Sequence, residues 1–302
     1  VKTIETGDNT WPLLLPMTKS AVRAMDTIQE YSKTSGKTEI KRFVVGGASK
    51  RGWTTWLTGA ADPERVKGII PMVYDNLNLN KQMKLQIEAY GSYSLEIKDY
   101  TDNNLQEKLN SELGTGLAKI VDPYSYIDRI TMPKLIINGA NDPYWNICSM
   151  NIYWSRLKGD KNVVYVPNAG HDLGMQKYEI QNAITVAGPI AAFVKSIATK
   201  SKLPAMKWKY VIKDHKVQLV ITTSVKDASA RIWIAKSSSR DFRPSKWEPV
   251  DMDTAKSGFT KTVSLPQDGY QTVYGEVMFP GDPGYSLSTQ VCCTDSKGKV
   301  GY

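Results

Sequence analysis

A serine among small residues, set between an apolar run and a helix-forming stretch, constrains the fold more than any other feature of the chain. The hexamer Gly47-Ala48-Ser49-Lys50-Arg51-Gly52 follows the apolar run 43–45 and precedes the stretch 53–59. This order predicts a strand, a sharp turn with Ser49 at its tip, and a helix. In such a turn the serine backbone is strained and its hydroxyl is lifted clear of the sheet. Arg51 stands where the pattern usually has its last glycine. The hexamer therefore indicates a catalytic serine only if an acid and a histidine accompany it elsewhere in the chain.

Two later strands end at residues that complete a catalytic set. The run 134–138 leads into a turn that ends at Asp142, and the run 162–166 leads into a turn that ends at His171. Serine, acid and histidine in this order, each just past a strand, is the order of α/β-hydrolases. Ser49 would attack an acyl carbon, His171 would take and return its proton, and Asp142 would orient the imidazole. The backbone N–H of Lys50 would supply one oxyanion donor.

A second aspartate competes for the role of triad acid. Asp75 follows the apolar run 66–73, and some hydrolases place the acid there. We favour Asp142 because the turn 139–142 stands at the strand end that is expected to carry the acid. The candidates for substrate binding are Arg51, Trp53, Asp75, Asn76 and Tyr144.

The expected fold class is α/β, with a three-layer hydrolase-like domain over residues 1–200. Four strands are predicted, at 43–45, 66–73, 134–138 and 162–166, after a helix at about 18–31. A full hydrolase sheet has about eight strands. We therefore expect this chain to carry the C-terminal half of the sheet, and an N-terminal fragment of the same precursor to be a partner.

An insertion at about 77–130 separates the second and third strands. It is rich in tyrosine and contains helical stretches at 81–90 and 104–113. In hydrolases a lid or cap sits here and shapes substrate choice. Alternatively, the tyrosines pack the small core of the cap itself.

The pattern changes after residue 200, where an alanine- and isoleucine-rich helix at 180–199 ends. Alternating strand-like runs follow at 209–212, 217–221, 230–234, 260–263 and 272–277, separated by turn residues. They predict a small immunoglobulin- or fibronectin-like β-sandwich domain over 205–302. We find no catalytic constellation in it, and His215 is expected in a solvated turn.

Four segments resemble the PhoPQ-activated pathogenicity-related family. They are Gly47-Ala48-Ser49-Lys50-Arg51-Gly52-Trp53-Thr54-Thr55-Trp56, Trp11-Pro12-Leu13-Leu14-Leu15-Pro16-Met17, Pro167-Asn168-Ala169-Gly170-His171 and Ser239-Arg240-Asp241-Phe242-Arg243. The resemblance implies a hydrolase-like domain followed by a small β-domain, in exported bacterial proteins and in secreted amoebal proteins, one of which represses cell proliferation. It implies no settled substrate. The turn around Ser49 also resembles that of glucuronoyl and acetyl-xylan esterases.

Charge and cysteine content bear on partners and cofactors. We interpret the net charge of +9 as that of an ordinary solvated surface. The alternative is that the positive charge attracts a cell surface or a polyanion. The sequence has no metal-ligand spacing, phosphate-binding glycine loop or nucleic-acid module, so we expect no metal, no cofactor and no specific nucleic acid. No apolar run approaches the roughly 20 residues of a membrane span. The adjacent Cys292 and Cys293 would bridge to each other only with strain, and the odd count with Cys148 leaves at least one thiol unpaired, so the sequence leaves the pairing open.

Together these observations predict a secreted serine hydrolase that cleaves an ester or peptide acyl bond of a small-molecule substrate through an acyl-enzyme. The order of Ser49, Asp142 and His171 carries this prediction, and it does not separate an esterase from a peptidase. The alternative is a non-catalytic secreted signalling or cell-surface binding protein that uses the hydrolase fold.

Overall fold

The computed structural model describes residues 1–36, 38–177, 180–281 and 284–301. The helices are α1 (Lys2–Thr6), α2 (Leu14–Thr34), α3 (Lys50–Ala61), α4 (Leu79–Tyr90), α5 (Lys98–Thr101), α6 (Leu105–Lys108), α7 (Glu112–Val121) and α8 (Ile180–Ala198), with short 3-10 turns η1 (Leu95–Ile97), η2 (Pro123–Arg129), η3 (Ser149–Ile152), η4 (Trp154–Arg156) and η5 (Met175–Lys177). The strands are β1 (Phe43–Ala48), β2 (Val66–Met72), β3 (Lys134–Gly139), β4 (Lys161–Val166), β5 (Met206–Lys213), β6 (Lys216–Thr223), β7 (Ser229–Ser237), β8 (Glu248–Asp251), β9 (Asp253–Ala255), β10 (Gly258–Ser264), β11 (Tyr270–Phe279), β12 (Tyr285–Ser288), β13 (Cys292–Asp295) and β14 (Gly298–Lys299).

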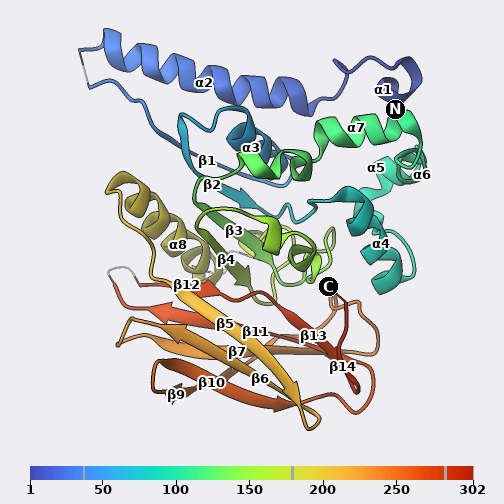
Figure 1. Cartoon of the computed structure of the whole chain (residues 1–302), viewed down its shortest axis with the longest axis vertical. Coiled ribbons are helices and arrows are strands. Elements are labelled where there is room, and N and C mark those ends of the chain that lie inside the picture. The colour runs from blue at the N-terminus through green and yellow to red at the C-terminus, as the bar shows by residue number, and fades with distance from the viewer. Residues whose placement is uncertain (37, 178–179, 282–283, 302) are drawn as a thin grey trace.

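The strands β1, β2, β3 and β4 form a parallel sheet in this order, between helices on both faces. Neighbouring residues of β3 point to opposite faces, as a period of two requires. Ile136 packs in the core that holds Trp56 of α3, whereas Leu135 and Ile137 pack in the core that holds Phe193 of α8. The helix α2 covers the outside of α3 (Figure 1). The four predicted sheet strands are confirmed: each has one end at the predicted residue, and the other end differs by three residues in β1 and by one in β2, β3 and β4.

The C-terminal strands extend the same sheet. The strand β12 pairs with β4 through Ser288 and Val163, and β11 continues the sheet to β13 on one path and to β7 and β8 on another. A second, four-stranded antiparallel sheet, in the order β5-β6-β10-β9, packs against this extension (Figure 1).

The expected separate sandwich domain is therefore not confirmed. Two sheets do pack face to face, but one of them is the continuation of the parallel sheet. Leu219 of β6 and Val273 of β11 share a core with Leu135 of β3. The β4–β12 junction could not be foreseen because its partners lie more than 120 residues apart.

The insertion between β2 and β3 forms the helices α4 to α7. The predicted helix at 81–90 matches α4, but the one at 104–113 is wrong, because α6 ends at Lys108 and α7 begins at Glu112. Ser111 caps α7 by accepting a hydrogen bond from the Gly114 amide, and a serine cap fixes a helix start. This insertion lies at the edge of the molecule beside α3 (Figure 1).

The helix α8 is, within the described residues, the one long and apolar enough by length and composition to cross a membrane, and 33% of its most apolar window is buried. It packs on β4 and β12, and core helices have the same composition. The three cysteines are buried and free, and His215 is exposed in the β5–β6 turn.

Candidate active site

The turn between β1 and α3 holds Ser49 in a strained conformation. Its backbone φ of 58° and ψ of −125° lie outside the regions that serine ordinarily adopts. The Ser49 amide donates to the Met72 carbonyl of β2 at 2.9 Å, which fixes the turn against the next strand. A Cβ on Gly52 would lie 2.6 Å from that same carbonyl oxygen, so glycine is required there, one place later than in the common pattern.

Ser49, His171 and Asp142 form one hydrogen-bonded chain. The Nε2 atom of His171 lies 2.8 Å from Ser49 Oγ, and its Nδ1 atom lies 2.8 Å from Asp142 Oδ2. Each residue stands just past a strand of the parallel sheet, so the sheet brings together side chains that are 122 and 29 positions apart. In this geometry the three side chains could serve as a nucleophile, a base and an orienting acid.

The loops that carry Asp142 and His171 touch each other directly. The Asn141 amide donates to the Ala169 carbonyl at 2.9 Å. This contact needs glycine at the end of β3, because a Cβ on Gly139 would lie 2.2 Å from the Gly170 carbonyl oxygen. The spacing between acid and histidine is thus set by backbone as well as by their side chains.

Asp142 is buried and well supplied with donors. It accepts from the Tyr144 amide at 2.8 Å in addition to His171. Burial raises the pKa of Asp142, while the hydrogen bond from His171 lowers it. An orienting carboxylate in this setting is shielded from water and fixed in one rotamer.

Asp75, the competing acid, does not contact His171 and lies in its own buried network. Its carboxylate accepts from the Tyr153 hydroxyl at 2.5 Å and from the Asn138 amide at 3.0 Å. Burial raises the pKa of Asp75 to about 7, and the hydrogen bond from Tyr153 opposes that shift. Asp75 therefore holds the buried side chains of Tyr153 and Asn138 and does not orient the imidazole of His171.

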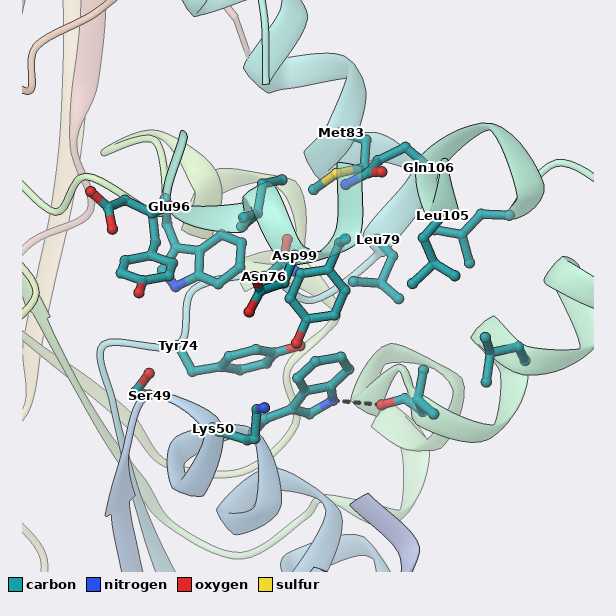
Figure 2. A pocket seen from close by; sticks show the side chains of 18 residues that line it. Ser49, Lys50, Tyr74, Asn76, Leu79, Met83, Glu96, Asp99, Leu105 and Gln106 are labelled. Atoms are coloured by element: carbon teal, nitrogen blue, oxygen red, sulfur yellow. Dashed lines mark hydrogen bonds between the residues drawn. The ribbon is translucent and has the colours of Figure 1, made fainter. Parts of the chain in front are cut away.

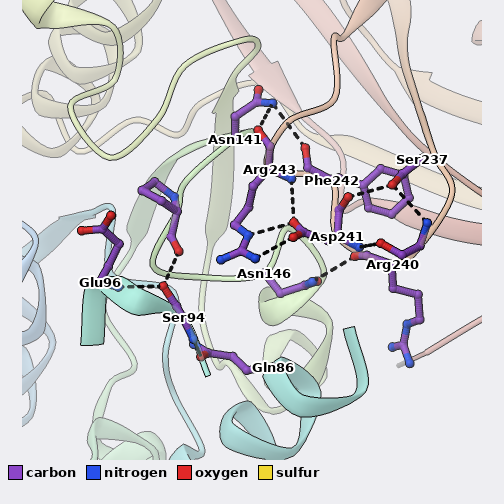
Figure 3. Close-up of polar contacts among 12 residues, drawn as sticks. Gln86, Ser94, Glu96, Asn141, Asn146, Ser237, Arg240, Asp241, Phe242 and Arg243 are labelled. Carbon is purple, nitrogen blue, oxygen red and sulfur yellow. Dashed lines mark hydrogen bonds and ion pairs between the residues drawn. The ribbon is translucent and has the colours of Figure 1, made fainter. Parts of the chain in front are cut away.

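A loop from the C-terminal half reaches back to the acid loop. We call residues 239–247 the strap (Figure 3). The side-chain amide of Asn141 donates to the strap carbonyls of Phe242, Arg243 and Ser245, at 3.3, 3.0 and 2.6 Å. Asn146 donates to the carbonyl of Arg240 at 3.3 Å. The strap thus ties down both ends of the segment 141–146 that carries Asp142.

The strap also holds the histidine loop and the insertion. Asn168 donates to the Trp247 carbonyl at 3.0 Å and accepts from its amide at 2.7 Å. The Arg243 guanidinium lies 3.7 Å from the Tyr90 ring centre and pairs with Asp241 in a two-pronged bond. One loop therefore touches three segments that border Ser49.

A cavity of about 440 Å³ opens beside Ser49 under the insertion (Figure 2). Trp53 and Tyr74 stack with ring centres 4.9 Å apart on one wall, and Trp145 meets Tyr74 edge-on. The insertion supplies apolar side chains from α4, α6 and α7. Such a cavity suits a small organic ligand.

The predicted binding residues divide into two groups. Trp53, Asn76 and Tyr144 line the cavity together with Lys50. Arg51 is exposed outside it, and Asp75 lies buried behind it. No cluster of metal-ligating side chains occurs in the described parts of the chain.

Sequence reasoning missed the residues that position the site through hydrogen bonds to partners far along the chain. Tyr153, Asn141 and Asn168 each act through contacts across 78 to 104 positions of sequence. One signal was at hand, because the strap contains the segment 239–243 that resembles the family and had no assigned role.

A parallel sheet with a serine on a strained turn after one strand, and an aspartate and a histidine after two others, defines the class of α/β-hydrolase-like folds. The chain belongs to the PhoPQ-activated pathogenicity-related protein family, which it matches over residues 1–243. It is 33% identical over 297 residues to the autocrine proliferation repressor protein A of Dictyostelium discoideum. The match covers 91% of this chain and spans 58% of that relative's length.

Solved structures with a similar fold include esterases and a peptidase. An acetyl xylan esterase from Paenibacillus sp. R4 has a TM-score of 0.38 and 18% identity, over 55% of this chain and 50% of that one. The acylaminoacyl peptidase of Pyrococcus horikoshii has a TM-score of 0.44 and 14% identity, over 58% of this chain and 27% of that one.

Proposed function

We propose that this protein is a serine hydrolase that cleaves an ester or peptide acyl bond through an acyl-enzyme. The hydrogen-bonded chain from Ser49 through His171 to Asp142, with 2.8 Å at both links, is the observation that supports it. The strained backbone of Ser49 and the cavity beside it add to that support.

In the proposed reaction the Ser49 oxygen bonds to the substrate carbonyl carbon while its proton passes to His171 Nε2. The same nitrogen then protonates the leaving group as the bond to that group breaks. Water next attacks the acyl carbon while His171 takes its proton. The bond from that carbon to Ser49 Oγ then breaks, His171 returns the proton to Ser49 Oγ, and the acid product leaves. The buried Asp142 holds the ring and stabilises its charged form between these transfers.

The oxyanion of each intermediate would lie near the Lys50 amide. That amide is the first of α3, and the first amides of a helix have no helical carbonyl to bind. The positive end of the helix dipole adds a favourable field for the negative oxygen.

The second candidate is a secreted signalling protein without turnover. It is favoured by one observation, the 33% identity to the autocrine proliferation repressor protein A of Dictyostelium discoideum. We further propose that the chain acts outside the cell in either case.

Labelling with a fluorophosphonate probe, read by intact mass, tests the first candidate. We expect one probe per chain in the natural protein and none in Ser49→Ala. His171→Ala should label at least about a hundredfold more slowly, because the serine loses its base. Ser20→Ala and His215→Ala alter exposed residues and serve as matched controls. Folded protein that does not label would favour the signalling candidate.

A further inference from the structure

The cavity beside Ser49 contains buried polar atoms that make no hydrogen bond among the described residues, the Tyr74 hydroxyl and two amide oxygens among them. Asn76 Oδ1 and Gln106 Oε1 are buried and, among the described residues, have no hydrogen-bond partner. Both side chains line the cavity, one from the segment after β2 and one from α6. A buried oxygen without a donor is unfavourable, so a ligand that donates a hydrogen bond to it is favoured over one that does not.

Two carboxylates stand at the same cavity. Glu96 and Asp99, from η1 and α5, line it on the side away from Lys50 (Figure 2). Burial raises the pKa of the Tyr144 hydroxyl, and the negative charges of Glu96, Asp142 and Asp99 raise it further, so both cavity carboxylates act on Tyr144, whose ring packs against the ring of His171. Lys50 is the basic side chain among the described lining residues, and it stands next to Ser49. The charge along the cavity therefore changes from positive near the serine to negative under the insertion.

The remaining wall is apolar. The lining comes from the helices α4, α6 and α7 and from the residue after α6: Leu79, Met83, Leu105, Leu117 and Leu109. An apolar body fits this wall, while donors and a positive charge fit the acceptors and carboxylates.

We propose that the cavity selects an acyl group that joins an apolar side chain to a protonated amine, as in an aminoacyl ester or at the free N-terminus of a peptide. The inference rests on the proposed hydrolase function and adds its substrate class. The carbonyl would lie at Ser49 and the side chain among the leucines, while the ammonium, two bonds from the carbonyl carbon, would face Asn76 and feel the negative field of the two carboxylates.

The test compares leucyl and N-acetyl-leucyl thiobenzyl esters, which differ in the charge of one nitrogen. We expect kcat/KM for the leucyl ester to exceed that for the acetylated ester by about tenfold or more. Because single exposed carboxylates contribute little, both are changed together in Glu96→Gln/Asp99→Asn. This variant should lose about tenfold on the leucyl ester and nothing on the acetylated one.

Asp102→Asn is the matched control, since Asp102 is an exposed acid on the same segment that pairs with Lys98 and does not line the cavity. Equal rates on the two esters, a preference for the acetylated one, or a labelled enzyme that turns over neither, would overturn the inference while leaving the hydrolase intact. If the fluorophosphonate probe fails to label, calorimetry with leucinamide and N-acetyl-leucinamide decides. Tighter binding of leucinamide would support the pocket assignment without catalysis, and equal or absent binding would refute it.

Discussion

The ring of Tyr144 lies 4.1 Å from the ring of His171 between centres, at an angle of 33°. Tyr144 comes two residues after Asp142, and its amide donates to that carboxylate. One residue therefore holds the acid with its backbone and covers the base with its side chain. The contact leaves His171 Nε2 directed at Ser49.

We expect Tyr144→Ala to slow fluorophosphonate labelling about three- to tenfold. An aromatic contact of this kind contributes about 0.5–1.5 kcal/mol, and without it the imidazole samples other orientations. Tyr144→Phe keeps the ring and should label at nearly the natural rate. A Phe variant as slow as the Ala variant would show that the hydroxyl, rather than the ring contact, matters.

Asn141→Ala tests the strap. The change removes the bonds to three strap carbonyls, and we expect a loss of about 1–3 kcal/mol in the free energy of unfolding together with slower labelling. Urea denaturation and probe kinetics measure the two effects. Asn151→Ala removes a comparable tie, to the Val291 carbonyl, from a segment without a triad residue. The Asn151 variant should lose stability but keep its labelling rate. Equally slow labelling in both variants would argue against a positioning role for the strap.

Gly139→Ala should disrupt the site more than any surface change. Its Cβ would lie 2.2 Å from the Gly170 carbonyl oxygen, so the histidine loop must move. We expect a loss of about 1–3 kcal/mol in stability, and labelling below detection. Gly116→Ala is the control, because a Cβ there meets nothing within 4 Å, and helix propensity predicts a small gain in stability. Normal labelling of the Gly139 variant would contradict the described loop contact.

Asp75 predicts a pH dependence of stability. Its folded-state pKa is raised to about 7 from an ordinary value of 3.8. Between those values the folded state keeps a proton that the unfolded state releases, so this contribution to stability is lost as pH rises from about 4 to about 7.

Asp75→Asn should reduce that slope, measured as the urea midpoint at several pH values across this range. The fold can accept the change, because the unpartnered Asn138 Oδ1 can turn to accept from the new amide. Asp227→Asn, at an exposed position, should leave the slope as it is. An unchanged slope in the Asp75 variant would mean that Asp75 is ionised in the folded protein.

Local signals were enough for the strands and for the candidate triad order. Ser49, Asp142 and His171 each follow an apolar run within a few residues, so their positions at strand ends were readable from the chain. The helix break at 109–111 was also local, but the cap at Ser111 competes with a continuous helical pattern on either side. The β4–β12 junction, the strap and the placement of Asp75 behind the cavity depend on contacts between distant segments, and no local pattern encodes them.

The strap has a consequence for recombining this protein with its relatives. Because Asn141 and Asn168 bind backbone atoms of residues 242–247, the acid and histidine loops are fitted to the path of one C-terminal loop. A hybrid that joins residues 1–200 of this chain to the C-terminal part of a relative would keep these bonds only where the relative's loop follows the same backbone path. Because the bonds go to backbone atoms, the length and path of that loop matter more than the identity of its side chains.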